Sequence, residues 1–280
     1  MFWSDGDGLF CGCLPLGISG GRQIKVINSK LKACKKTGVL NLSDGDLADG
    51  MWQLIQEEEL QQKIRTLDVS GNQLKALPVE IITLVNLKTL HVSRCGIQRI
   101  ADLSLLSKLA VLSLDKNDLE TVAALPLSLT RLNMASNHIA TFPSTLSTLV
   151  AVTELNLSSN RLESLAGIGG MAGLVTLNLD GNCLCELPEE AGHLLKLRQI
   201  SLKNNRFSKK AFTHNGQSIP TSFFIQTLVD TIDLGGNPGL TKAHVLDFEG
   251  VQTFVERRKR VKDKTLQGGA LTDFNLFGLD

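Results

Sequence analysis

The feature that most constrains this chain is an eleven-residue phrase that occurs in seven copies in register. In VTELNLSSNRL, which begins at Val152, apolar and polar residues alternate and an asparagine follows. The copies begin 20 to 23 residues apart, at Ile64, Leu87, Leu109, Leu129, Val152, Leu174 and Leu197. A fixed period of this length is typical of repeat architectures, in which each unit packs only against its neighbours. The chain is therefore predicted to fold as a solenoid.

Strand geometry explains why the phrase alternates. Side chains of a strand point to opposite faces in turn, so Leu155 and Leu157 face the core while Glu154 and Asn156 face outward. The pattern L-x-x-L-x-L-x-x-N-x-L is the consensus of the leucine-rich repeat, with one short parallel strand in each coil. It predicts an α/β solenoid, a horseshoe with a concave parallel β-sheet, about nine coils and helical caps at both ends.

The asparagine of each phrase is predicted to turn the chain off the strand while its amide bonds backbone groups in the bend. Stacked coils would align these residues in a purely structural column. The column comprises Asn72, Cys95, Asn117, Asn137, Asn160, Asn182, Asn205 and Asn237. Cys95 takes the place of an asparagine with a small, buried thiol.

Five segments follow from the pattern. Residues 1–21 and 265–280 are predicted to be flexible tails, since the first is rich in glycine and the second lies beyond the last periodic stretch. Residues 22–36 carry apolar residues at helical spacing and should cap the first coil. Repeats occupy 37–240, and 241–264 reads as a C-terminal capping helix, so the repeat domain spans 22–264 in all.

Two stretches are longer than the period. Between the first two coils, a convex-side helix through Met51, Trp52, Leu54, Ile55 and Leu60 is expected, with Glu57–Glu59 on its solvated face. Before Val229, an insertion is predicted to end in a short helix that contains Phe223 and Phe224.

Charge and cysteine usage narrow the class of protein. Lys and Arg number 29 against 28 Asp and Glu, so the chain as a whole is no polyanion binder. None of the six cysteines follows Cys185, so none could staple a C-terminal cap as in extracellular repeat proteins. The apolar run Leu9–Ile18 is too short to span a bilayer and lacks a basic flank. We expect a cytoplasmic protein with reduced thiols.

Both ends of the chain leave alternatives open. Cys11 and Cys13 lie among apolar residues and are either S-acylated or ordinary thiols. The basic run Arg257–Lys264 is either a solvated helix face or, with an acylated tail, the second signal of a peripheral membrane contact. The terminal residues LFGLD, 276–280, either dock on a partner or fold back on their own solenoid.

No motif of a reaction centre is present. The sequence has no phosphate-binding loop, no H-E-x-x-H and no C-x-x-C, and Cys183 and Cys185 have no second ligand pair. We therefore expect no enzyme activity, no metal and no cofactor.

A concave sheet instead predicts a protein partner, because its outward residues can vary without touching the core. The face has no aromatic residue and no basic stripe, which excludes nucleic acid. The candidate partner-binding residues are His91, Arg94, Lys116, Arg131, Asn133, Glu154 and Asn156. Alternatives are a solvated face with binding at the ends, or a regulatory subunit that clamps a phosphatase or a small GTPase. A monomer is expected.

The end units carry a resemblance. With KKTGVLNLSDGDL at Lys35–Leu47 and LDFEGVQTFVERRKRVKDK at Leu246–Lys264, the chain resembles a family of small intracellular leucine-rich repeat proteins. The resemblance implies a repeat protein without catalytic activity. Some relatives have an N-terminal Met-Gly myristoylation signal, but here Phe2 follows Met1, so no acceptor glycine is available.

Overall fold

A computed structural model of the chain describes residues 4–5, 9–10, 21–47, 49–209, 217–265 and 277–279. Contacts divide the chain into two compact units, Met1–Leu129 and Thr130–Asp280. The prediction of one repeat domain over 22–264 stays a prediction, and each unit is described by itself. The boundary follows the return segment 118–128, which contains no helix to pack on its neighbours.

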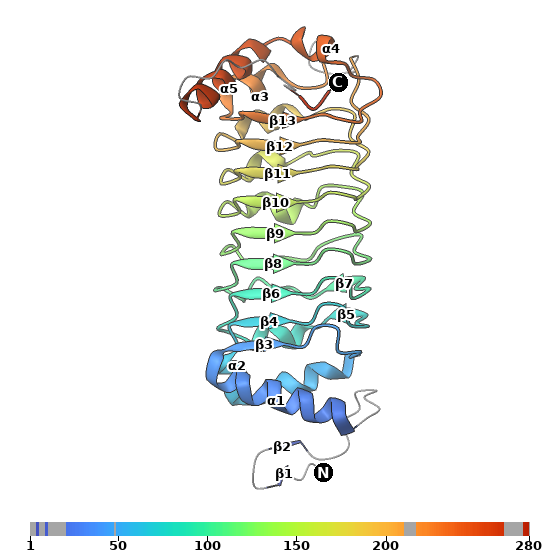
Figure 1. Ribbon diagram of the computed structural model, residues 1–280, viewed down its shortest axis with the longest axis vertical. Helices are drawn as coiled ribbons and strands as arrows, with labels where there is room; N and C mark the ends of the chain where they lie inside the picture. Colours follow the sequence, from blue (N-terminus) through green and yellow to red (C-terminus); the bar gives the residue numbers. More distant parts are fainter. Residues whose placement is uncertain are drawn as a thin grey trace. The chain divides into compact units, whose positions relative to one another are not determined.

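The first unit contains four parallel strands, one from each coil. They are β3 (Val39–Asn41), β4 (Thr66–Asp68), β6 (Thr89–His91) and β8 (Val111–Ser113), paired in this order (Figure 1). The register aligns Leu40, Leu67, Leu90 and Leu112, and all four side chains are fully buried. The predicted stacking of parallel coils around inward leucines is therefore confirmed in this unit.

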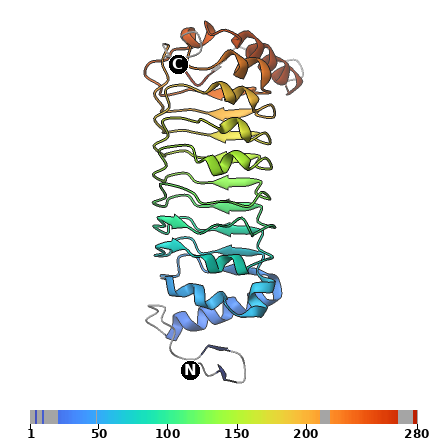
Figure 2. The ribbon, with the colours of Figure 1, turned by 180° about the vertical axis from the view of Figure 1, so that it is seen from behind.

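The return side of the first unit is short and regular. Strands β5 (Ala76–Leu77) and β7 (Arg99–Ile100) pair in parallel, and the 3-10 helix η2 (Val79–Thr83) follows Pro78. The short helical turns lie behind the strands in Figure 1 and in front of them in Figure 2. They thus cover the inner face of the sheet and leave its other face open.

The N-terminal cap differs in detail from the prediction. Helix α1 (Gly21–Thr37) buries Ile27, Leu31 and Cys34, and Gly38 ends it at a φ of +75°. A single convex-side helix through residues 51–60 is wrong, because the 3-10 helix η1 (Asp49–Ile55) is followed by a separate helix, α2 (Glu58–Lys63).

The acidic run at the start of α2 is not simply solvated. Glu57 and Glu59 both form ion pairs with Lys35 of α1, with Nζ of Lys35 2.9 Å from Oε2 of Glu59. These pairs join the two helices of the cap. Before α1, β1 (Ser4–Asp5) and β2 (Leu9–Phe10) form an antiparallel pair.

The second unit repeats the pattern with five parallel strands. They are β9 (Arg131–Asn133), β10 (Glu154–Asn156), β11 (Thr176–Asn178), β12 (Gln199–Ser201) and β13 (Thr231–Asp233). The 3-10 helices on the return side are η3 (Ser144–Thr148), η4 (Ile168–Gly170) and η5 (Glu189–His193). The middle residue of each strand is buried, as in the first unit.

The C-terminal cap consists of three helices, α3 (Thr221–Gln226), α4 (Lys242–Leu246) and α5 (Val251–Thr265). The sequence predicts one helix over 241–264. The helix breaks before Gly250, which has a φ of +85° and approaches α3 so closely that a Cβ there would lie 3.2 Å from the carbonyl oxygen of Thr221. Only glycine suits this position, and the apolar spacing alone cannot reveal the break.

Residues 277–279 are packed, which corrects the prediction of a flexible tail over 265–280 for these three residues. Phe277 is fully buried, and its ring stacks on Phe254 of α5 with centroids 5.4 Å apart. The Phe277 carbonyl accepts a hydrogen bond from the Leu234 N–H at 2.7 Å. Two apolar side chains, Phe277 and Leu279, are thereby removed from water, which favours the folded-back position.

Candidate binding surface

The open face of the parallel strands presents regularly spaced side chains to solvent in each unit. We call it the outer sheet face and define it by the two side chains that flank the buried middle residue of every strand. In the first unit these are Val39, Asn41, Thr66, Asp68, Thr89, His91, Val111 and Ser113. In the second unit they are Arg131, Asn133, Glu154, Asn156, Thr176, Asn178, Gln199, Ser201, Thr231 and Asp233. All are exposed or half-buried.

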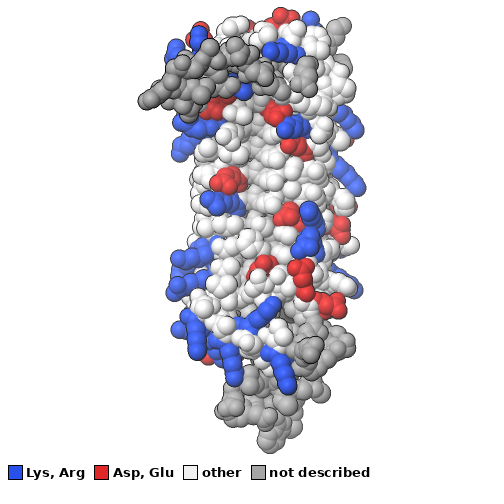
Figure 3. All heavy atoms as spheres, viewed as in Figure 1, with Lys and Arg blue, Asp and Glu red and all other residues white. Residues whose placement is uncertain are grey.

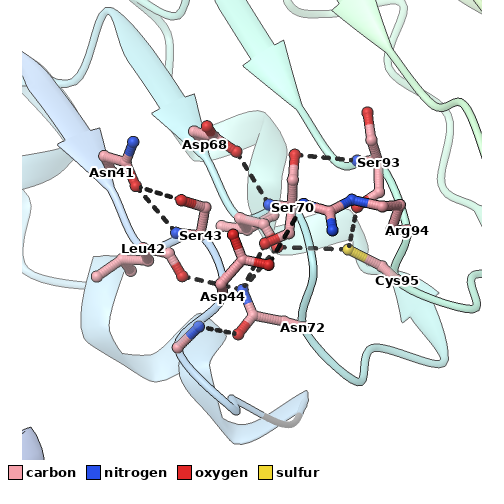
Figure 4. A network of polar contacts seen from close by, with 12 residues as sticks. Asn41, Leu42, Ser43, Asp44, Asp68, Ser70, Asn72, Ser93, Arg94 and Cys95 are labelled. Carbon is pink, nitrogen blue, oxygen red and sulfur yellow. Dashed lines mark hydrogen bonds and ion pairs between the residues drawn. The ribbon is translucent and has the colours of Figure 1, made fainter.

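The asparagine column holds this face in place. In Asn72, Nδ2 donates to the carbonyls of Val69 (2.6 Å) and Leu42 (2.9 Å), and Oδ1 accepts from the Leu47 N–H at 2.9 Å (Figure 4). Asn182 repeats the pattern in the second unit, with Leu157 and Leu162 of the preceding coil. Each amide thus joins two coils and satisfies backbone groups that burial would otherwise leave unpaired.

Cys95 keeps part of this pattern. Its Sγ lies 3.3 Å from the carbonyl oxygen of Val69 and 3.4 Å from that of Ser93, so its single S–H can donate to one of them at a time, whereas the amide nitrogen of an asparagine has two donors (Figure 4). The thiol has no counterpart of the amide oxygen, and the Leu74 N–H donates to the Cys95 carbonyl instead, at 3.0 Å. Burial raises the pKa of the Cys95 thiol, which keeps it protonated and unreactive at neutral pH.

The predicted binding residues of the first unit occupy two kinds of position. His91 lies on the outer sheet face, with Nδ1 3.2 Å from the hydroxyl oxygen of Ser113. Arg94 and Lys116 lie in the turns after β6 and β8, each with a φ of +57°, a conformation that is uncommon for long side chains. Arg94 pairs with Asp44, a partner fifty residues away that the sequence does not indicate, at 3.3 Å (Figure 4).

The second unit brings two of the predicted residues into contact. Nε of Arg131 lies 3.2 Å from Oε1 of Glu154, the residue directly beside it in the parallel register. The side chains are 62% and 53% exposed, so the pair faces solvent. Asn133 and Asn156 occupy the other outward position of the same strands and accept hydrogen bonds from the N–H groups of Ala135 and Ser158. The seven predicted residues are thus divided between the two units.

The surroundings of these groups can be compared with those of known kinds of site. The ring of His91 faces a serine, but no carboxylate among the described residues orients it, and a catalytic triad needs that third group. Within the described ranges, no three His, Cys, Asp or Glu side chains are arranged to hold a metal ion. Helices of the described chain are also too short or too polar to cross a bilayer.

The basic run of α5 is partly structural. Arg257 donates to the carbonyl oxygens of Val229 (2.6 Å) and Phe224 (3.0 Å), so its guanidinium ties α5 to the preceding segment. Burial lowers the pKa of both Arg257 and Arg258. Arg260 lies 3.8 Å from Glu256 on the exposed side of the helix. Cys11 and Cys13, the predicted acylation sites, lie outside the described residues.

Comparison with known proteins places these features among repeat proteins. No family model matches the chain. A relative from Dictyostelium discoideum, named MAP kinase phosphatase with leucine-rich repeats protein 1, is 42% identical over 82 residues, which are 29% of this chain and 10% of that protein. Oligodendrocyte-myelin glycoprotein from Homo sapiens is 30% identical over 195 residues, 67% of this chain and 42% of that protein. The chain therefore spans less than half the length of either relative.

A solved structure, described as a Shigella effector LRR domain, superposes with a TM-score of 0.54 at 26% identity. The superposition covers 69% of this chain and 81% of that one.

Proposed function

We propose that this chain, a leucine-rich repeat protein, is a non-enzymatic scaffold that binds a protein partner through its outer sheet face. One observation carries the proposal. Each three-residue strand of the two units buries its middle side chain completely or almost so, while both flanking side chains remain accessible. The accessible residues can therefore serve recognition without any cost to the core.

Arg131 and Glu154 are the strongest anchors on this face. Arginine is enriched among the residues that dominate binding energy at interfaces. A solvent-exposed ion pair contributes only about 0 to 1 kcal/mol to stability, so a partner can recruit either side chain at little cost. The neighbouring asparagines and threonines supply hydrogen-bonding groups at regular spacing across β9 to β11.

The first test reverses these charges. Arg131→Glu should lower capture of the partner by immobilised protein roughly tenfold or more. An acidic group of the partner that pairs with Arg131 would then face a carboxylate in a buried interface, and like charges repel. The exchange Arg131→Glu with Glu154→Arg keeps the internal pair and the net charge, so its thermal unfolding should match the native chain, yet capture should still fall.

The matched control is Arg161→Glu, which makes the same charge change in the turn after β10, away from the outer sheet face. It should leave capture unchanged. Equal capture by the native chain, Arg131→Glu and the exchanged pair would rule out these anchors.

A second function has some support from the comparisons. The Dictyostelium relative carries a phosphatase in its name, beside its leucine-rich repeats. By analogy, the chain could serve as a regulatory subunit that clamps a catalytic partner, such as a phosphatase or a small GTPase. This second function requires that the captured material contain an enzyme in a stoichiometric amount relative to the chain. Mass spectrometry of the eluate detects such an enzyme.

The remaining parts of the proposal concern the location of the protein in the cell and the proteins that it resembles. The end units resemble those of leucine-rich repeat-containing protein 57, and this resemblance supports a small intracellular protein. That the protein is cytoplasmic and monomeric is part of the proposal. Peripheral attachment to a membrane would rest on acylation of Cys11 or Cys13, and hydroxylamine-sensitive sedimentation with membranes would detect it.

A further inference from the structure

Five cations lie along the edge of the first unit where the chain enters each strand. Each stands immediately before or after the first residue of a repeat phrase. We call this set the basic strip; it comprises Lys36, Lys63, Arg65, Lys88 and Lys108. All five side chains are exposed, and no acidic residue occupies an equivalent position in this unit. Figure 3 shows the Lys and Arg atoms gathered along the left edge, over the strands β3 to β8.

Backbone hydrogen bonds align the strip. The Arg65 N–H donates to the Gly38 carbonyl, and the Lys88 N–H donates to the Arg65 carbonyl, both at 2.7 Å. Successive coils of a parallel sheet are about 4.8 Å apart, so the cations form a row along the stacking direction. Lys108 Nζ also donates to Asn86 Oδ1 at 2.6 Å, which holds that side chain over the neighbouring coil.

The second unit lacks this feature at the same repeat positions. There the equivalent residues are mostly small or apolar, and the cations are Lys196 and Arg198. Arg198 lies 3.7 Å from Asp230, and this carboxylate partly neutralises the positive charge that Arg198 presents to a ligand. A chain with a formal charge of only +1 thus has five cations on one edge of one unit, and none of the five forms an ion pair with a residue that the structure describes. The positive charge of this edge is therefore a local feature, which the nearly neutral net charge of the protein does not reveal.

The surroundings of the strip point to a ligand that is narrow and chain-like. Carboxylates lie close to the strip along the chain: Asp68 of β4 is the third residue after Arg65, and Glu57 and Glu59 form ion pairs with Lys35, which directly precedes Lys36. A flat anionic bilayer would meet these carboxylates as well as the cations. Single-stranded nucleic acid requires aromatic side chains on which bases stack, and the exposed large hydrophobic residues of the described chain are all aliphatic.

Two of those aliphatic residues lie in the turns that lead into the same coils. Val85 precedes β6 and Leu105 precedes β8, and both are exposed. Their presence suits a polypeptide in which apolar residues are interspersed among acidic ones. From this combination we infer that the basic strip binds an acidic segment of a partner protein. The inference rests on the proposed protein-binding function and adds a second surface with its own partner chemistry.

The test uses the full chain and a fluorescein-labelled peptide built from repeats of Glu-Glu-Leu-Asp, followed by fluorescence anisotropy. The peptide should bind, and its affinity should fall as salt rises, because exposed charges are screened. Lys63→Glu with Arg65→Glu should weaken binding roughly tenfold or more. Lys196→Glu with Arg198→Glu is the matched control: it replaces the same residue types at the same repeat positions of the second unit and should change the affinity less than about twofold.

The other outcomes contradict the inference. Absence of peptide binding, or equal losses in both double variants, would show that the strip does not select acidic segments. Phosphatidylserine vesicles and polyuridylate are the competing probes. Binding of either that is lost in Lys63→Glu with Arg65→Glu, while the peptide does not bind, would assign the strip to lipid or nucleic acid instead. Thermal unfolding of each variant confirms that it is folded.

Failure of the strip and failure of the outer sheet face are separable. Arg131 and Glu154 lie in the second unit, so their variants leave the basic strip unchanged. If the peptide does not bind but Arg131→Glu still abolishes partner capture, the strip alone is contradicted. If the peptide binds through the strip but charge reversal at Arg131 has no effect on capture, the anchors on the outer sheet face alone are contradicted.

Discussion

Replacement of Asn182 by alanine should lower the free energy of unfolding by about 3 kcal/mol, because a buried network loses several hydrogen bonds at once. Nδ2 of Asn182 donates to the carbonyls of Leu157 (3.0 Å) and Leu179 (2.9 Å), and Oδ1 accepts from the Leu162 N–H at 3.0 Å. Alanine supplies none of these groups and leaves buried backbone atoms unpaired. Denaturant unfolding followed by circular dichroism measures the loss.

Asn178→Ala is the control, since it removes the same residue type from the same coil. Asn178 lies on the outer sheet face and accepts a single local bond from the Asp180 N–H at 3.0 Å. Its replacement should cost less than about 1 kcal/mol. Similar losses in the two variants would mean that the asparagine column does not hold the coils together.

Phe277→Ala should be destabilising by about 3 kcal/mol, although the residue lies at the end of the chain. Its side chain is fully buried against Phe254, and its carbonyl continues the hydrogen bonds that run from coil to coil. The Leu202 N–H donates to the Asp233 carbonyl in the same way that the Leu234 N–H donates to that of Phe277. The C-terminal residues thus take the place of a further coil.

Ile225→Ala is the corresponding control, because Ile225 belongs to the same cap but is 54% exposed. A change below about 0.5 kcal/mol is expected for it. An unchanged unfolding midpoint in Phe277→Ala would show that the terminal segment is not part of the folded cap. In that case the sequence LFGLD would be accessible as a docking peptide, the other alternative that its composition allows.

The strands of this protein could be predicted because their signal is local. The period of two within each phrase fixes which residues face inward, and the register of Leu132 with Leu155 and Leu177 follows from the repeat length. The asparagine positions follow for the same reason. Short-range periodicity thus suffices for the repeats themselves.

The ends could not be predicted in the same way, because their contacts are long-range. The break before Gly250 depends on its approach to Thr221, and Phe277 depends on Phe254. Likewise Arg94 pairs with Asp44, and Lys35 pairs with Glu57 and Glu59. The basic strip differs from these contacts, because its signal is present in the sequence as cations beside the first residue of successive phrases. The alternation within the strands does not indicate it, since these cations precede the strands.

Photo-crosslinking from two positions of one coil tests the central proposal most directly. Benzoylphenylalanine at Gln199 would stand on the outer sheet face, whereas the same residue at Leu195 would stand on the return side, where that leucine is 56% exposed. After irradiation with the captured partner, a covalent adduct is expected from position 199 and not from position 195. An adduct from position 195 alone would contradict binding through the outer sheet face.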